Sequence, residues 1–286
     1  MCDDHTEEDN ARYFATRRQF AVGAGAVGLM AVLPSPANAA TVAGRNVVIT
    51  TPDGEADAYF VAPTTGKHPA VLVWPDIMGL RPAFEQMGKR LAESGYAVLV
   101  VNQFYRGTKA PFLKPGEDWQ APDTRAKIMG WRAMLSQAGT ARDATAFINW
   151  LDQQKSVNPK RGVATTGYCM GGPMTMITAA TLPGRVRAGA SFHGGGLATD
   201  KPDSPHLLVP KMKAQYLFAV AENDDQRGPA EKEKLREAYL AAKLPAEIEV
   251  YAGAMHGWCP PDSKVYNAAQ AEKAWSRQLA LFKRAL

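Results

Sequence analysis

Cysteine, aspartate and histidine, the residue types that together perform acyl transfer, occur in this chain in that order. Residues 167–172 read Gly-Tyr-Cys-Met-Gly-Gly, between a β-branched run and a helical run. This pattern is typical of a nucleophile elbow, a tight strand-to-helix turn that lifts its central side chain above the sheet edge. Here Cys169 stands where serine is usual, at a helix N-terminus whose dipole favours a thiolate. A buried structural cysteine in a glycine-rich turn is the alternative.

Candidate partners for Cys169 follow two later apolar runs. Asp224 and Asp225 come after one of them, and His256 comes after the last. The carboxyl ends of parallel strands meet at one sheet edge, so we expect these side chains to lie together. His256 would take the thiol proton and later protonate the leaving group, while a carboxylate fixes its tautomer. Only one adjacent acid can face the imidazole; Asp224 is favoured by its distance from the strand end, and Asp225 stays open.

Two backbone amides are expected to form an oxyanion hole. One should come from Met170, which follows the nucleophile, and the other from the loop at 75–79, with Ile77 the favoured residue. Residues 193–196 read His-Gly-Gly-Gly, like a lipase motif that precedes its nucleophile, whereas this copy follows it. We therefore expect it to shape the site wall, with His193 a candidate substrate contact.

The rest of the chain predicts a sheet that can hold these residues at one edge. Strands are expected at 46–51, 56–62, 70–74, 96–101, 162–166, 187–192, 215–220 and 247–251. Helices are expected at 83–94, 140–154, 170–181, 229–242 and 267–286. Apolar runs such as VLVW indicate strands covered on both faces. The fold class is therefore α/β: a doubly wound, mostly parallel sheet with helices on both faces and an antiparallel hairpin, turned at Asp53-Gly54, at one edge.

Residues 107–139 interrupt this alternation. The stretch is rich in proline and aromatic residues, and connections of this length often serve as lids or binding walls. An ordinary two-helix excursion over the surface is an equal alternative.

Residues 1–39 have the features of a cleaved twin-arginine export signal. Arg17-Arg18 precedes an apolar run too short and glycine-rich to be a stable membrane anchor, and a small-residue cleavage site ends at Ala39. A mobile amphipathic tail is the alternative. The expected partner during export is the twin-arginine translocation machinery, the expected location is the periplasm, and residues 40–286 would form a single domain.

Charge and cysteine content exclude several classes of protein. The net charge is +5 and rises to +7 without residues 1–39, which hold three arginines and five acidic residues. This suits anionic small molecules, but no basic run indicates nucleic acid binding. No cysteine–histidine cluster indicates a metal. Two cysteines in an oxidising compartment favour a disulfide; the elbow argues against it, and we predict that Cys169 and Cys259 stay thiols.

Five segments carry a resemblance to a known family. WPDIMGL, ESGYAVLVVNQFYRG, GYCMGG, AENDD and MHGW, in this order, resemble the dienelactone hydrolase family over the chain from about residue 46. The resemblance implies an α/β-hydrolase fold, a Cys-Asp-His triad, and hydrolysis of a small lactone or ester without metal or cofactor. It assigns the nucleophile, acid, base and two oxyanion amides to Cys169, Asp224, His256, Ile77 and Met170.

The resemblance also assigns residues around the triad. Asp76 falls where family members carry a glutamate that hydrogen-bonds the resting thiol, so it is the candidate thiol-gating carboxylate. Arg106 matches an arginine that grips the substrate carboxylate, but a second family arginine after the histidine has no equivalent here, and Arg81 is a candidate substitute. The resemblance thus leaves an ester other than dienelactone open as the substrate. The expected substrate-binding set is completed by Tyr105, His193 and Trp258.

Three functions compete at this stage. The leading one is a hydrolase that forms a thioester on Cys169. A second keeps the fold as a non-catalytic periplasmic ligand-binding protein whose cysteine is oxidised. The third, a thiol redox protein, would pair Cys169 with Cys259.

Overall fold

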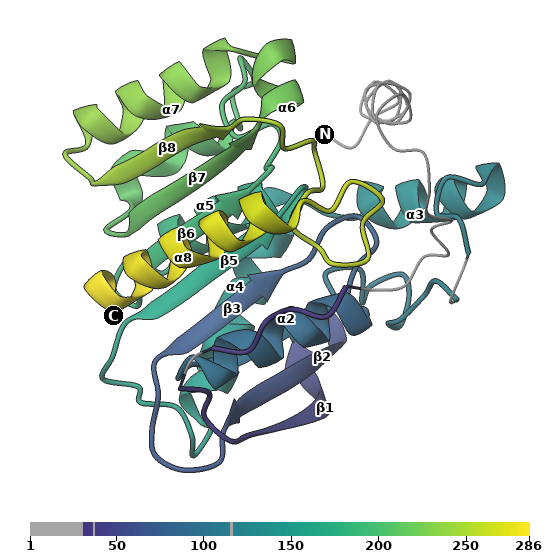
Figure 1. The fold of residues 1–286 in the computed structure, drawn as a ribbon, viewed down its shortest axis with the longest axis vertical. Coiled ribbons are helices and arrows are strands. Elements are labelled where there is room, and N and C mark those ends of the chain that lie inside the picture. The colour runs from purple at the N-terminus through teal and green to yellow at the C-terminus, as the bar shows by residue number, and fades with distance from the viewer. Residues whose placement is uncertain (1–30, 37, 115–116) are drawn as a thin grey trace.

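A computed structural model describes residues 31–36, 38–114 and 117–286 of the chain (Figure 1). The strands are β1 (Val42–Thr51), β2 (Gly54–Pro63), β3 (Ala70–Trp74), β4 (Ala97–Val101), β5 (Val163–Tyr168), β6 (Val186–Phe192), β7 (Gln215–Ala221) and β8 (Ala246–Tyr251). The helices are α2 (Pro82–Glu93), α3 (Pro122–Ala133), α4 (Gln137–Asp152), α5 (Gly171–Thr181), the 3-10 helix η1 (Pro205–Lys211), α6 (Glu222–Arg227), α7 (Ala230–Ala241) and α8 (Ala268–Ala285).

The strands form one twisted sheet in the order β1-β2-β4-β3-β5-β6-β7-β8. β1 and β2 form an antiparallel hairpin, β2 pairs antiparallel with β4, and all later pairs are parallel. The hairpin closes at Gly54, whose φ of +128° suits glycine. The expected mostly parallel sheet with an N-terminal hairpin is confirmed, although the hairpin strands are longer than the sequence pattern predicts.

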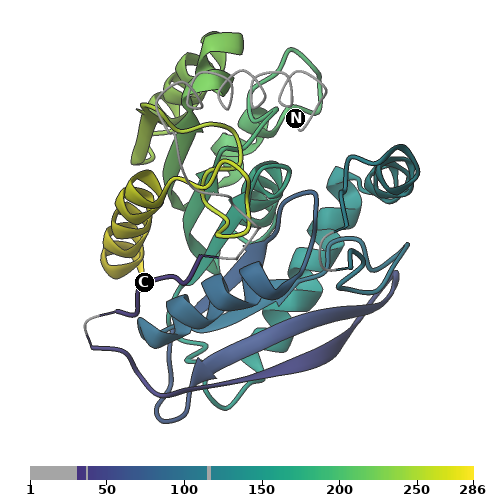
Figure 2. The same ribbon diagram turned by 45° about the vertical axis from the view of Figure 1, so that its right-hand side comes forward.

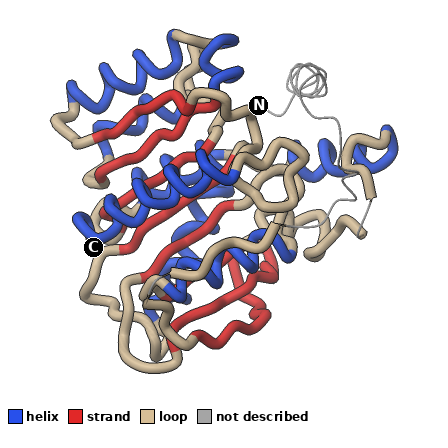
Figure 3. Tube along the Cα trace, viewed as in Figure 1, coloured by secondary structure: helices blue, strands red, loops and turns tan. Residues whose placement is uncertain are grey.

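Two helical layers cover the sheet (Figures 1 and 3). Helices α2 and α8 pack on one face, and α4, α5 and α7 pack on the other. Every residue of β3 and β4 is buried, as expected for strands covered on both sides. Because helices seal both faces, the carboxyl ends of the parallel strands are the edge at which side chains can meet a ligand.

Three elements were not expected as separate helices: α3, η1 and α6. Helix α3 lies within the long connection and projects from the body of the domain (Figure 2). Helix α6 starts directly after β7 and carries both candidate acids, Asp224 and Asp225. The acids therefore stand on a rigid turn of helix rather than on a loop.

The chain before β1 is only partly described. The twin-arginine motif at 16–20 and most of the apolar run after it lie outside the described residues. Where the description begins, the Ala31 amide donates to the carbonyl of Pro261 at 3.0 Å, and Leu33 packs on the core face formed by α2 and α8. Within the described ranges, no helix combines the length and apolar character needed to cross a bilayer.

Candidate active site

Cys169 occupies a sharp turn between β5 and α5. Its φ is +52°, a left-handed conformation that costs energy for any residue other than glycine, and its exposure is 2 %. The turn tolerates no Cβ on either side: one on Gly167 would meet the Gly171 carbonyl oxygen at 2.1 Å, and one on Gly171 would meet that of Trp74 at 2.2 Å. The two glycines thus allow the chain to turn tightly enough to present the sulfur.

His256 and Asp224 meet beside this turn. The imidazole Nδ1 lies 2.7 Å from Asp224 Oδ2, and the His256 amide donates to Asn223 Oδ1 at 2.8 Å. Asp225, the alternative acid, accepts from Lys232 Nζ at 2.6 and 2.7 Å instead. The structure therefore directs Asp224, and not Asp225, at the imidazole.

The electrostatic surroundings of His256 favour its charged form. Burial works to lower its pKa, but the Asp224 carboxylate and the Cys169 sulfur, each by charge and by a hydrogen bond, raise the pKa to about 10. A histidine with such a pKa is an imidazolium at neutral pH. Cys169, His256 and Asp224 therefore form one hydrogen-bonded, charge-coupled unit.

The turn after β3 lies directly against the elbow. A Cβ on Gly171 would approach the carbonyl oxygens of Trp74 and Pro75 at 2.2 and 2.8 Å. This contact places Ile77, which is buried, in the turn next to the helix N-terminus that starts with Met170. The two segments expected to supply oxyanion amides are therefore neighbours.

Asp76 has other partners than the thiol. Its Oδ1 accepts from the Met78 amide at 2.9 Å and from Arg81 Nη1 at 2.7 Å, and its Oδ2 accepts from Arg81 Nη2 at 3.0 Å. Burial raises the pKa of Asp76, against the influence of Arg81. Asp76 thus forms a buried ion pair with Arg81, and Cys169 lies close enough for its charge to raise the pKa of Asp76 as well. The gating of the Cys169 thiol by Asp76 stays a prediction. Arg81 is not a solvated clamp, because it is only 7 % exposed.

His193 supports the elbow instead of facing solvent. It is fully buried with φ +40°, and its Nδ1 accepts from the Cys169 amide at 3.1 Å. Its Nε2 has no hydrogen-bond partner among the described residues. Burial, and after it the charge of His256 at a ring distance of 5.1 Å, lower the pKa of His193 well below its ordinary value. His193 is therefore neutral, and its burial argues against the expected substrate contact.

Trp258 and Cys259 also lie inside the protein. Trp258 is fully buried, stacked on Tyr251 with 5.4 Å between ring centroids and edge-on to His193 at 5.2 Å. The expectation that Trp258 contacts substrate is corrected: it packs beneath the histidine loop. Cys259 is buried, and both Cys259 and Cys169 are free cysteines in this structure.

Arg106 and Tyr105 take part in a network at the end of β4. The Arg106 guanidinium donates to Asp143 through Nη1 and Nη2, both at 2.8 Å, and to Asp53 Oδ2 at 2.6 Å. Tyr105 is buried, and its hydroxyl donates to Asp143 Oδ1 at 2.7 Å. The expected substrate clamp therefore already binds two carboxylates, and it joins the hairpin turn to α4.

The long connection forms a cap over the turn after β3. Phe112 stacks edge-on against Phe104 at 5.6 Å and Trp131 at 5.0 Å. A Cβ on Gly79, where φ is +67°, would meet the Phe112 ring at 2.6 Å. Within α3 only Ile128 is buried. The aromatic cluster around Phe112 is therefore the main contact between the long connection and the rest of the domain.

Sequence patterns missed three residues that position this site. Asn223 holds the His256 backbone, Asp143 binds Arg106, and Asp262 binds Arg81 at 2.6 and 3.0 Å. Asn223 could have been noticed from its place between the strand end and the acid. The other two stand in a helix interior and a proline-rich loop, where no local signal marks them.

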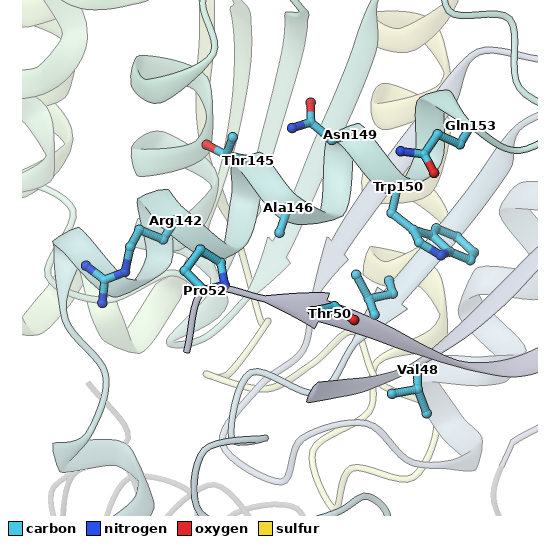
Figure 4. A pocket seen from close by; sticks show the side chains of 10 residues that line it. Val48, Thr50, Pro52, Arg142, Thr145, Ala146, Asn149, Trp150 and Gln153 are labelled. Carbon is cyan, nitrogen blue, oxygen red and sulfur yellow. The ribbon is translucent and has the colours of Figure 1, made fainter. Parts of the chain in front are cut away.

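Other features of the described residues do not compete with this site. No group of three or more histidine, cysteine, aspartate or glutamate side chains in that part of the chain is arranged to hold a metal ion. A surface hollow of about 710 Å³ lies between β1 and α4, lined by residues that include Val48, Arg142 and Trp150 (Figure 4). No residue of the Cys169–His256–Asp224 unit lines it, so the hollow is not where the chemistry would occur.

The sheet order, the helices on both faces and the elbow after β5 define an α/β-hydrolase. The model of the dienelactone hydrolase family matches residues 56–286. The chain belongs to this family and is a carboxylic ester hydrolase, which confirms the resemblance stated from the sequence.

Named relatives and solved structures agree with this assignment. A protein of Escherichia coli K12, provisionally named carboxymethylenebutenolidase, is 26 % identical over 94 % of this chain and 97 % of its own length. A Bradyrhizobium protein, provisionally named 2-oxo-3-(5-oxofuran-2-ylidene)propanoate lactonase, is 28 % identical over 78 % of this chain and 86 % of its own. The structure of a provisionally assigned dienelactone hydrolase from Klebsiella pneumoniae has a TM-score of 0.73 at 23 % identity, covering 85 % of this chain and 99 % of that one, and shows the shared fold.

Proposed function

We propose that this enzyme hydrolyses a small, anionic lactone or ester through a thioester on Cys169. The observation that carries the proposal is the unit described above: a cysteine in elbow conformation, coupled to a histidine whose Nδ1 lies 2.7 Å from Asp224. A nucleophile, a base within reach of it and an acid that orients the base are the parts required for covalent acyl transfer.

Acylation begins from a thiolate–imidazolium pair. The Cys169 sulfur attacks the carbonyl carbon, and the oxygen becomes an oxyanion that the amides of Ile77 and Met170 stabilise. When the tetrahedral intermediate collapses, the bond from carbon to the leaving oxygen breaks, and the imidazolium of His256 gives its proton to that oxygen. In a lactone the released hydroxyl stays attached to the acyl group.

Deacylation reverses these roles. Neutral His256 takes a proton from water as the water oxygen attacks the thioester carbon. Collapse of the second intermediate breaks the carbon–sulfur bond and returns Cys169 to the thiolate beside the imidazolium. The carboxylic acid product loses its proton to solvent, so one water is consumed and the enzyme is unchanged.

Two observations support an anionic substrate. The chain carries a net charge of +5, and the names of both relatives denote substrates with a carboxyl group. Arg106 does not act as a ready clamp, because Asp53 and Asp143 already hold it. We expect carboxylated lactones to be hydrolysed with higher kcat/KM than neutral esters of similar size; the reverse order would refute the anionic part alone.

Intact-protein mass spectrometry tests the chemistry directly. An activated aryl ester mixed with the wild type should add one acyl mass, which peptide mapping should place on Cys169. The Cys169→Ala variant should show no adduct, and its turnover should fall by about a thousandfold or more. Hydrolysis at equal rates by both proteins would refute the thioester mechanism.

We also propose that residues 1–39 direct export through the twin-arginine pathway, with cleavage after Ala39 and a periplasmic enzyme as the product. The support is the Arg17-Arg18 pair followed by an apolar run and a small-residue site. Fractionation of cells that express the full chain should give periplasmic, shortened protein. Replacing both arginines by lysine should retain it in the cytoplasm, and export of that variant would contradict the proposal.

A further inference from the structure

Arg81 connects two loops of the active site through a fully used guanidinium. Its Nε donates to Asp262 at 2.6 Å; Nη1 donates to Asp76 at 2.7 Å and to the Gly79 carbonyl at 3.1 Å; Nη2 donates to Asp76 and Asp262, each at 3.0 Å. A guanidinium has five N–H donors, and all five are engaged here. Burial works to lower the pKa of Arg81, but the two carboxylates raise it, so the group stays charged.

One arm of this connection holds the turn after β3. Asp76 accepts the Met78 amide through its side chain at 2.9 Å and the Gly79 amide through its carbonyl at 2.9 Å. These bonds surround Ile77, the residue expected to donate its amide to the oxyanion. The Asp76 carbonyl, which shares its peptide unit with the Ile77 amide, also accepts from Gln103 Nε2 at 2.8 Å. The orientation of this peptide therefore depends on Gln103 and on where Arg81 holds the Asp76 side chain.

The other arm holds the loop that follows β8. Asp262 stands six residues after His256, in a loop braced by bonds from the Trp258 amide to the Met255 carbonyl and from the Ser263 amide to the Pro260 carbonyl, both 3.0 Å. Asp262 is 181 residues from Arg81 in sequence. No nearer chain connection between the two loops sets their spacing, so a rigid, bidentate side-chain contact is suited to do so.

We propose that Arg81 is a positioning residue that fixes the Ile77 amide relative to His256, acting through Asp76 and Asp262. The inference rests on the proposed function and deepens it. It gives Asp76 a role in addition to the predicted gating of the thiol: the carboxylate anchors the oxyanion turn. Misplaced donors weaken binding of the transition state more than binding of the ground-state carbonyl, so the loss should fall on kcat rather than KM.

A matched control lies in α2, the helix that Arg81 precedes as its N-cap residue. Arg90 is as buried as Arg81, at 7 %, and pairs with Glu272 by two bonds of 2.7 and 2.6 Å, 182 residues away in sequence. It lies nine residues further along α2, which is about 13 Å from Arg81 along the helix axis. The hydrogen bonds of the Arg90 guanidinium thus join α2 to α8, and among the described residues they reach neither the turn after β3 nor the loop after β8.

The experiment compares Asp262→Asn with Glu272→Gln on a chromogenic ester. Both should lower the melting temperature, because each weakens a buried arginine pair. Only Asp262→Asn should lower kcat, by about 10- to 100-fold, with KM within about twofold of the wild type. Equal kcat for Asp262→Asn and the wild type, or equal losses for both variants, would overturn the positioning role.

Arg81→Lys provides a second variant should Asp262→Asn fail to fold. Lysine keeps the charge but cannot hold two carboxylates with a planar fork, so kcat should fall while Arg90→Lys keeps the wild-type value. Acylation of Cys169 in the wild type, followed by mass spectrometry, separates the two proposals. If the wild type never acylates, the proposed function fails; if it acylates and Arg81→Lys turns over normally, only the positioning role fails.

Discussion

The two buried cysteines of the domain show how differently one protein can treat the same side chain. Cys169 is 2 % exposed and Cys259 is 7 % exposed. Cys169 stands in a left-handed turn, coupled to an imidazolium. Cys259 lies against Tyr168, Phe192 and Trp275, and burial raises its pKa well above its ordinary value.

The contrast teaches that burial does not decide the chemistry of a thiol. Withdrawal from water favours the neutral form of any thiol. At Cys169 a neighbouring cation and a helix N-terminus oppose that effect, whereas Cys259 has aromatic neighbours. In the proposed mechanism, His256 and Asp224 supply the reactivity of Cys169. The comparison between the two cysteines can be tested by changing the surroundings of either one.

Removing each sulfur in turn should give the largest difference. Cys169→Ala should lower kcat/KM for a chromogenic ester by about a thousandfold or more, as expected when a nucleophile is lost. Cys259→Ala should stay within about twofold of the wild type. Steady-state kinetics on both purified variants measures this; a comparable loss in the two would erase the distinction between the cysteines.

Replacing the acid Asp224 should make Cys169 as unreactive as Cys259. Asp224→Asn leaves the imidazole without a carboxylate, and kcat should fall by about a hundredfold or more. Asp225→Asn is the matched control, because Asp225 pairs with Lys232; its kcat should match that of the wild type. A larger loss in Asp225→Asn would assign the triad to the other acid.

The pH dependence of stability should distinguish the two sites. The pKa of His256 is about 10 in the folded protein against an ordinary 6.5. Its contribution to stability is thus complete below about pH 6.5 and is lost as pH rises towards 10. Burial raises the pKa of Cys259 above the ordinary thiol value of 9.0, so this thiol affects stability only above about pH 9.

In the wild type the Cys169 thiolate offsets the proton that His256 gains, so the window is read in Cys169→Ala, where Asp224 still raises the pKa of the imidazole. Between pH 7 and 9, the melting temperature of Cys169→Ala should therefore fall, and adding Cys259→Ala should leave that slope unchanged. Adding His256→Gln to Cys169→Ala should flatten the slope. Thermal unfolding followed by circular dichroism provides the measurement, and an unchanged slope in Cys169→Ala/His256→Gln would show that the imidazole is not the titrating group.

The smallest effect is expected when a polar atom replaces the sulfur of Cys259. Cys259→Ser places a hydroxyl among aromatic rings, and without a hydrogen-bond partner it should cost about 1–3 kcal/mol of unfolding free energy. Cys259→Ala should cost less than Cys259→Ser. Urea unfolding curves compare the two variants. A serine variant as stable as the wild type would contradict the description of the surroundings of Cys259 as apolar.

Much of this fold could be predicted because its signals are local. Continuous apolar runs mark strands covered on both faces, and such strands bring their carboxyl ends to one edge. Cys169 and His256 could be placed at that edge without coordinates. The flanking glycines carried the elbow signal, since Gly167 and Gly171 leave no room for a Cβ.

Contacts between distant segments could not be predicted. The ion pair of Asp76 depends on where the chain puts Arg81, which the place of Asp76 in the sequence does not show. The choice between Asp224 and Asp225 required α6, because adjacent helical residues point about 100° apart and so face different partners. Trp258 follows a histidine in a loop, and only packing shows that it is buried.

The cap has a consequence for how this enzyme could be re-engineered. Its ring contacts rest on the space left by the missing side chain of Gly79, while most of α3 faces outward. The outward-facing side of α3 can therefore be varied, provided that Phe112 and its contact with Gly79 are kept. Libraries that vary this side would leave the turn after β3 undisturbed.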